Sequence, residues 1–301
     1  MMRAPTAWAV AVRQPDDVIV ARRDDLPRLS TRSLGARIPF VRGVFVLAES
    51  LSLGFRALSW SAQKATGEDE EPLTKTEIGW TMALALIIFA GLFILLPAGA
   101  ASLVSGDFDV LFGVIEGVLR LVIFVGYIWA IGRSEEIGRV FEYHGAEHMS
   151  IHAYEAGEPL TVDSVKRYSP EHPRCGTSFL LIVILGSIIL FSALGRHGVV
   201  FLISSRLLGI PLIAGASYEL LRFSGTRTSG RFAHILAVPG MWLQKLTTKV
   251  PDESQIEVAI SSLVVALDDE AFVDVAGRGA LPSVATEARA LVFSTAPELD
   301  S

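Results

Sequence analysis

Four of the six histidines and the only cysteine of this chain lie in one 32-residue stretch, 144–175. The stretch reads HGAEHMSIHAYEAGEPLTVDSVKRYSPEHPRC, and long apolar runs lie on both sides of it. Imidazole, thiolate and carboxylate groups are the usual ligands of zinc and similar ions. The sequence therefore predicts a metal site at the edge of a membrane.

The first part of this stretch, His144-Gly-Ala-Glu147-His148, is an HxxEH pattern. Positions i, i+3 and i+4 share one face of a helix, and the pattern is the inverted form of the zinc-protease motif. A bound metal brings the pKa of its water to about 7. We therefore expect a divalent metal, zinc in the first instance, with His144 and His148 as ligands and Glu147 as the general base.

A further protein ligand has three candidates in the sequence. His172 and Cys175 form an HxxC pair after a gap at 153–171, and Glu219 ends an apolar run level with the His-rich stretch. The alternative is that the histidines are solvated helix residues and that Cys175 is a small buried side chain, since free cysteine is often buried.

The composition favours a membrane protein. The chain is 51% hydrophobic and 19% charged, with a mean hydropathy of +0.47, whereas soluble domains carry about 25% charged residues. The net charge of −6 and the lack of a basic patch exclude nucleic acid as a partner. A single cysteine excludes an internal disulfide.

We predict a mainly α, polytopic membrane protein whose partner is the lipid bilayer. About 20 apolar residues suffice to cross a bilayer, and four runs come close to or exceed this length, at 80–103, 108–131, 179–194 and 199–221. Short connectors at 105–109 and 195–198 join them into two hairpins. Lys and Arg gather at 3–56, 133–174 and 222–249, so the positive-inside rule predicts that both termini and the His-rich loop are cytoplasmic.

The remaining segments read as peripheral structure. Residues 6–23 predict a short β-hairpin around Gln-Pro-Asp-Asp. Arg42, Glu49 and Arg56 are spaced seven apart, which predicts an amphipathic helix over 38–62 lying at the interface. Residues 256–269 predict an amphipathic helix in the C-terminal tail. The resulting segments are 1–65 (hairpin and interfacial helix), 78–132 (hairpin 1), 133–176 (cytoplasmic His/Cys-rich loop), 177–223 (hairpin 2) and 224–301 (cytoplasmic tail).

Besides Glu219, three charged residues lie well inside the apolar runs. Glu116 and Arg120 are spaced i,i+4 and can neutralise each other, whereas Arg206 lies deeper and suits either a carboxylate partner or a polar cavity. The other interpretation is that these three side chains line the path of a small transporter.

Four ordered motifs carry a family resemblance: FEYHGAEH (141–148), HPRCGTSFL (172–180), PLIAGASYELLRF (211–223) and LQKLTTKVPDESQIEVAI (243–260). The chain resembles the YqhQ-like bacterial membrane proteins, described as predicted metal-dependent enzymes of unknown function. The resemblance implies a bacterial cell membrane location and supports a metal site. Family members begin with a stretch like GGQAVIEGVMMR before the part that matches MMRAPTAWAVAVR, so we expect a start site called too late.

The sequence leaves three functions open. The first is a metal-dependent hydrolase acting at the cytoplasmic membrane surface. The second is a non-catalytic scaffold in which a structural metal or hydrogen bonds clamp the His-rich loop. The third is a small transporter, which four spans could form by assembling into a homo-oligomer.

Overall fold

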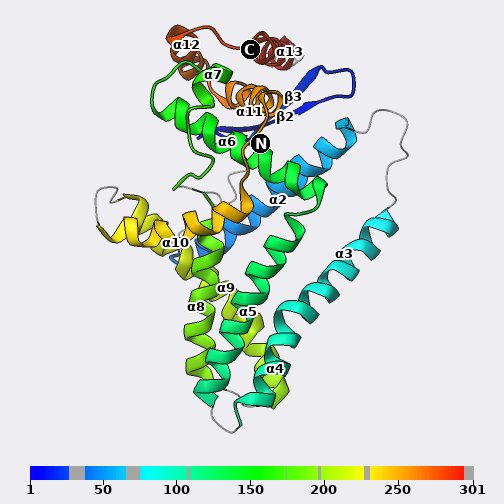
Figure 1. Ribbon diagram of the computed structural model, residues 1–301, viewed down its shortest axis with the longest axis vertical. Coiled ribbons are helices and arrows are strands. Elements are labelled where there is room, and N and C mark those ends of the chain that lie inside the picture. The colour runs from blue at the N-terminus through cyan, green and yellow to red at the C-terminus, as the bar shows by residue number, and fades with distance from the viewer. Residues whose placement is uncertain are drawn as a thin grey trace.

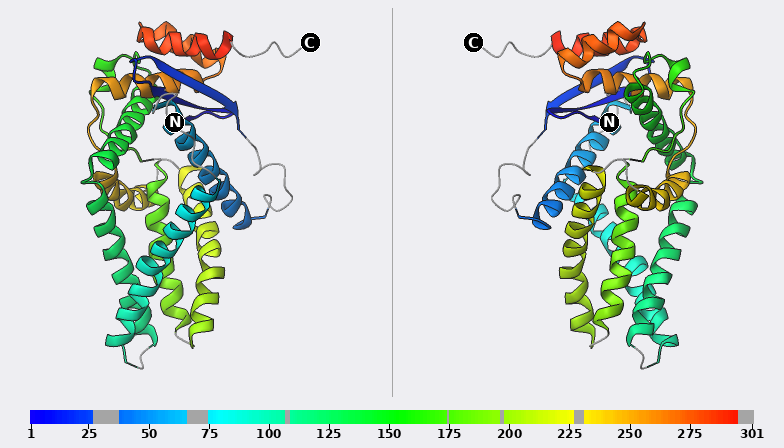
Figure 2. Two further views of the ribbon diagram at one scale, coloured as in Figure 1. Left: turned by 90° about the vertical axis from the view of Figure 1, so that its right-hand side faces the viewer. Right: turned by 90° about the vertical axis from the view of Figure 1, so that its left-hand side faces the viewer.

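The computed structural model describes residues 1–26, 38–65, 75–106, 109–173, 175–195, 198–226 and 231–294. Long helices form a bundle at one end of the molecule, and a small sheet covered by helices forms a cap at the other (Figure 1). The bundle consists of α3, η2, α4, α5, α8 and α9. The cap consists of β1–β3, α6, α7 (Val162–Val165), α11, α12 (Asp269–Arg278) and α13. Helix α2 (Val41–Ala65) runs from the bundle to the cap (Figure 2).

Three bundle helices are long and apolar enough to cross a membrane. They are Gly79–Val104, which comprises most of α3 (Lys75–Ala90) with η2 (Gly91–Leu95) and α4 (Leu96–Val104); Val110–Ile131 in α5 (Asp109–Ile131); and Val200–Arg222 in α9 (Gly198–Thr226). The apolar part of α8 (Thr177–Leu194), Phe179–Leu194, is shorter. The predicted apolar helices are thus confirmed as helices, while the count of four spans stays a prediction.

Close packing of α5 on α8 depends on two glycines. A Cβ atom on Gly113 would lie 2.3 Å from the Cα atom of Ser192, and one on Gly117 would lie 2.4 Å from Cγ1 of Ile188. Such distances are shorter than any real carbon contact, so a larger side chain would push the helices apart. Small residues allow this approach between apolar helices, where dispersion contacts drive association.

Glu116, Arg120 and Arg206 form one largely buried cluster within the apolar helices. Glu116 is 1% exposed; its Oε1 accepts a hydrogen bond from Arg120 Nη2 at 2.6 Å, and its Oε2 accepts one from Arg206. Arg120 Nε also donates to the Phe93 carbonyl at 3.0 Å. That carbonyl is available because Pro97, four residues later, has no N–H to donate to it. The predicted pairing of Glu116 with Arg120 is therefore present, and Arg206 joins it.

The cap contains an antiparallel sheet in the order β1-β2-β3. Strands β2 (Ala7–Arg13) and β3 (Ile19–Asp25) form the predicted hairpin, and β1 (Met2–Arg3) adds a short edge strand. The turn between β2 and β3 includes Asp17 at φ 70°, a left-handed conformation that Asp tolerates better than most residues. The β-hairpin prediction is confirmed.

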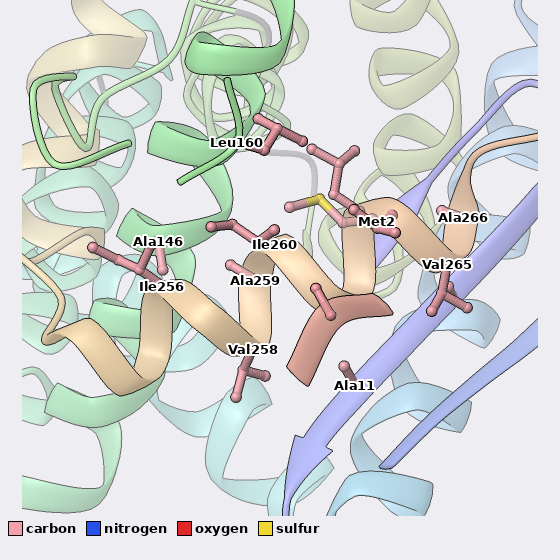
Figure 3. Close-up of a cluster of buried hydrophobic side chains, with 14 of the residues drawn as sticks. Met2, Ala11, Ala146, Leu160, Ile256, Val258, Ala259, Ile260, Val265 and Ala266 are labelled. Carbon is pink, nitrogen blue, oxygen red and sulfur yellow. The ribbon is translucent and has the colours of Figure 1, made fainter. Parts of the chain in front are cut away.

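Helix α11 (Glu253–Ala266) is the centre of the cap. Asp252 and Gln255 form a capping box at its start. It packs on α6 (Glu135–Glu155), on the sheet and on α13 (Ser283–Ser294). Figure 3 shows its apolar side chains in one cluster with Ala146 of α6 and Ala11 of β2. Nearly all its side chains are buried, so the predicted helix exists but is a core helix rather than an amphipathic surface one. One hydrophobic core thus unites the N-terminal hairpin, the His-rich segment and the C-terminal tail.

Helix α2 uses its charges differently from the prediction. Glu49 is 2% exposed and pairs with Arg3 at 2.8 Å, and Arg42 pairs with Glu219 on α9. Only Arg56 of the predicted charged stripe is exposed. The stripe therefore fixes α2 to the cap and the bundle instead of marking a water-facing side, because buried charges need partners. Large apolar side chains of α2 are exposed instead, including Leu51, Phe55 and Leu58.

Candidate metal centre

The HxxEH pattern lies on α6, which begins only four residues after α5 ends at Ile131. Ser134 caps the helix by accepting a hydrogen bond from the Ile137 N–H at 3.3 Å. The negative charges of Glu135 and Glu136 in the first turn stabilise the helix by interacting with the positive end of its dipole. The predicted loop is therefore helical over its first half. The motif therefore lies on the helix that directly follows an apolar helix in the chain.

Three of the predicted ligands converge. One ligand atom each from His144, His148 and Cys175 lie within 4.8 Å of one another. Cys175 Sγ is 3.3 Å from His144 Nε2, and the two imidazole rings are 4.4 Å apart between centroids. His148 is only 5% exposed. Two imidazoles and one thiol are a donor set that suits zinc, and three protein ligands are the number typical of catalytic zinc sites.

Backbone carbonyls fix the orientation of both rings. His144 Nδ1 lies 2.8 Å from the carbonyl oxygen of Thr247, and His148 Nδ1 lies 2.6 Å from that of Pro170. A carbonyl can only accept, so each Nδ1 carries a hydrogen, and the neutral form of each ring has its lone pair on Nε2. This is the arrangement by which proteins orient metal-binding histidines. The residues present therefore fit a zinc-type ion.

Gly145 allows the chain after α10 (Arg231–Thr247) to reach the site. A Cβ atom on Gly145 would lie 2.1 Å from the carbonyl oxygen of Lys249. The Lys249 N–H donates to the Phe141 carbonyl at 3.0 Å, which holds this segment against α6. Because the Thr247 carbonyl belongs to the same segment, its contact with His144 depends on this close approach.

His172 lies beside the three-residue group rather than in it. Its ring centroid is 5.8 Å from that of His148, and its Nε2 is 3.6 Å from a carboxylate oxygen of Glu155. Gln244 on α10 holds the His172 backbone with two hydrogen bonds, of 2.8 and 2.9 Å. The turn that follows places Cys175, whose N–H donates to the His172 carbonyl at 3.2 Å.

Glu147 lies on α6 between His144 and His148, and its charge acts on His144. Its side chain is 28% exposed and forms an ion pair with the amino group of Met1. Together with His144 it lines a cleft between α2, β2, α6 and α11. A carboxylate beside the ligand group and open to a cleft is placed as a general base needs to be.

Glu219 lies in a different contact. It binds the Arg42 guanidinium, with Nε to Oε1 at 2.5 Å, and accepts a hydrogen bond from the Phe40 N–H at 3.4 Å. These contacts join α2 to α9. Glu219 therefore does not belong to the group formed by His144, His148 and Cys175.

The local environment acts on the protonation of His144. Burial lowers the pKa of His144, whereas the hydrogen bonds to Cys175 and to the Thr247 carbonyl and the charge of Glu147 raise it. The effects that raise the pKa prevail, so the pKa of His144 lies above the ordinary histidine value. A metal ion competes with a proton for the same Nε2 atom, so metal affinity at this site should fall as the pH falls.

Comparison with known proteins places the chain in a family. Residues 38–269 match the family described as "Protein of unknown function (DUF1385)". The chain belongs to this family. It is also 32% identical over 273 residues to the uncharacterized protein YqhQ of Bacillus subtilis (strain 168), with 85% of each chain covered. No solved structure matches the chain. The predicted YqhQ-like resemblance is confirmed, and the matched region includes all three residues of the group.

Sequence reasoning missed the residues that position the ligands. Thr247 and Gln244 come from the family motif at 243–260, which we quoted without assigning a role to it. Pro170 and Gly145 lie inside the His-rich stretch but have no side chain that could bind a metal. A glycine inside a helix that also carries two candidate ligands was the available signal, since glycine weakens a helix unless something approaches it closely.

Gly145→Ala tests whether the close approach positions the site. The added methyl group collides with the Lys249 carbonyl, so we expect the segment to shift and zinc affinity to fall by about 10- to 100-fold, the usual cost of losing outer-shell support. Competition with a chromogenic chelator measures this. Gly157→Ala would be strained by its positive φ, so Gly277→Ala, with nothing within 4 Å, is the matched control. Equal affinities for wild type and Gly145→Ala would contradict this role.

Proposed function

We propose that this protein is a membrane-embedded metal-dependent hydrolase whose site lies at the membrane surface. The observation that supports this most is the convergence of His144, His148 and Cys175, with both Nδ1 atoms bound by backbone carbonyls. These three residues would hold one divalent ion, most simply zinc. When bound, the ion would supply a water of lowered pKa at neutral pH.

The chain's own residues then have distinct parts. Glu147 accepts a proton from the attacking water, whose oxygen forms a bond to the carbonyl carbon of the substrate. The bond from that carbon to the leaving group then breaks, and Glu147 returns the proton to the leaving group. Thr247 and Pro170 keep the imidazoles oriented. Three protein ligands leave a position open for water, which favours catalysis over a purely structural site with four ligands.

The membrane setting supports this proposal. The three long apolar helices are compatible with insertion, and α6 starts four residues after one of them ends. We infer a bacterial cell membrane protein with four spans and with both termini and the cap in the cytoplasm. The cap side of the bundle is where the basic segments at 133–174 and 222–249 fall, as the positive-inside rule requires.

Glu147→Gln separates catalysis from a structural role. The amide keeps the shape of the side chain but cannot accept the proton, so we expect unchanged zinc content and a fall in hydrolysis of about 10²- to 10⁴-fold. Purified protein, with and without zinc, is assayed on a p-nitrophenyl ester of a fatty acid. Glu158→Gln, on the loop after α6, is the control.

Two results would contradict the proposal. One is wild-type protein that shows no zinc-dependent hydrolysis. The other is a Glu147→Gln variant that binds zinc and hydrolyses the ester as fast as wild type; this result would favour the scaffold, in which the two rings and the thiol only clamp α6 to the segments after it.

A further inference from the structure

The cleft beside Glu147 has the size of a ligand site. It encloses about 770 Å³ between α2, β2, α6 and α11, within the range of roughly 300 to 1,000 Å³ that small-molecule pockets have. His144 and Glu147 form part of its wall. A molecule in this cleft would therefore lie against the candidate metal centre.

The lining of the cleft is divided by chemistry. Helix α6 contributes most of the charged and large polar groups, among them Arg139, His144 and Glu147, while α2, β2 and α11 contribute small or apolar side chains such as Leu58 and Val258 together with three serines and Arg13. A ligand with one polar end and one apolar end matches this division, because each end then meets atoms of its own kind.

The polar wall includes an arginine available to an anion. Arg13, at the rim, is already bound by Asp17 and Glu257. Arg139 is exposed and, within the ranges that the structure describes, has no ion-pair partner. Its charge acts on Asp252, but that carboxylate is engaged in capping α11. The cleft thus offers a guanidinium that makes no direct ion pair with a carboxylate of the described residues, on the same helix as His144 and His148.

The apolar wall continues to the outside of the molecule. Leu58 lines the cleft and is 65% exposed, and Leu51 and Phe55 extend the same exposed apolar surface along α2. Helix α2 starts against α9, where Arg42 binds Glu219 near the end of an apolar helix. An apolar surface that leads from the bundle to the cleft suits a ligand that comes from the membrane surface.

We propose that this cleft binds a single-chain amphiphile with an anionic head group, and that such amphiphiles are the substrate class of the hydrolase proposed above. The acyl chain lies between α2, β2 and α11, and Arg139 binds the head group beside His144 and Glu147. The substrate claim rests on the proposed function, whereas the binding claim does not need a metal.

Substitution of Gly54 can block the part of the cleft that would hold the acyl chain. Gly54 lines the cleft, and a Cβ atom placed on it meets nothing within 4 Å. Gly54→Phe therefore starts from a Cβ position that is free of clashes and is expected to place its ring in the cleft. It also removes a glycine from a helix interior, so α2 should not be destabilised. Gly277→Phe on α12 (Asp269–Arg278), also with nothing within 4 Å, is the matched control outside the cleft.

The test is native mass spectrometry of the full-length protein, released from detergent, with palmitoyl lysophosphatidate and palmitoyl lysophosphatidylcholine as probes. We expect one tightly bound lysophosphatidate on wild type and on Gly277→Phe. Gly54→Phe should weaken it at least about tenfold, since displacing two or more methylene groups from an apolar site has this effect. Arg139→Gln should remove the preference for lysophosphatidate over lysophosphatidylcholine.

The same measurement on chelator-treated and Glu147→Gln protein separates the two proposals. Lipid binding that survives both treatments supports the cleft even if no zinc is found, and zinc binding without cleft binding overturns only this inference. Two results overturn it directly. One is equal lysophosphatidate binding by wild type and Gly54→Phe, and the other is displacement of the lipid by millimolar inorganic phosphate.

Discussion

Replacing Glu116 with glutamine is expected to destabilise the protein more than any other single change in the bundle. The substitution leaves Arg120 and Arg206 facing each other without the carboxylate that now binds both. Removing one partner from a buried ion pair costs about 3–5 kcal/mol. The melting temperature in detergent should fall by on the order of 10 °C.

A second carboxylate–arginine contact provides the control. Glu219→Gln also removes the charge facing an arginine, Arg42, but both side chains are partly exposed, so water can replace the lost contact. We expect its melting temperature to stay within about 3 °C of wild type. If the two variants melted together, the buried cluster would not be a main source of stability in the bundle.

His148→Ala is expected to have the largest effect on the metal. The change removes one of three converging ligands and leaves the Pro170 carbonyl without its donor. Outer-shell changes alone weaken metal binding by about 10- to 100-fold, so loss of a ligand should exceed 100-fold. Isothermal titration of the metal-free protein with zinc measures the difference.

His152 is the matched control on the same helix. It lies one turn after His148, but its ring stacks on Tyr168 and its Nε2 contacts the Glu171 carbonyl at 2.9 Å. Because it lies outside the three-residue group, His152→Ala should keep zinc affinity within about threefold of wild type. An equal loss of zinc affinity in both variants would mean that the ion does not bind at the group formed by His144, His148 and Cys175.

Local patterns in the sequence were enough to predict the elements. The i, i+3, i+4 spacing predicted that His144, Glu147 and His148 share a helix face, and the structure has them on α6. Long apolar runs predicted the bundle helices, and the Gln-Pro-Asp-Asp turn predicted the β2–β3 hairpin. Each of these signals depends on residues close together in the chain, where periodicity determines the outcome.

Contacts between distant residues could not be predicted in the same way. Sequence spacing offered His172, Cys175 and Glu219 equally as a further ligand, and only the fold separates Cys175, 3.3 Å from His144, from Glu219, which binds Arg42. The burial of α11 has the same origin. Its pattern looks amphipathic alone, but α6, the sheet and α13 cover it from several sides.

Zinc K-edge X-ray absorption on the zinc-loaded, detergent-purified protein identifies the ligand atoms of the bound ion. We expect one zinc per chain with a single sulfur at about 2.3 Å and imidazole nitrogens at about 2.0–2.1 Å, and loss of the sulfur signal in Cys175→Ser. Protein that takes up no stoichiometric zinc, or a zinc shell without sulfur in the wild type, would contradict the proposed metal site.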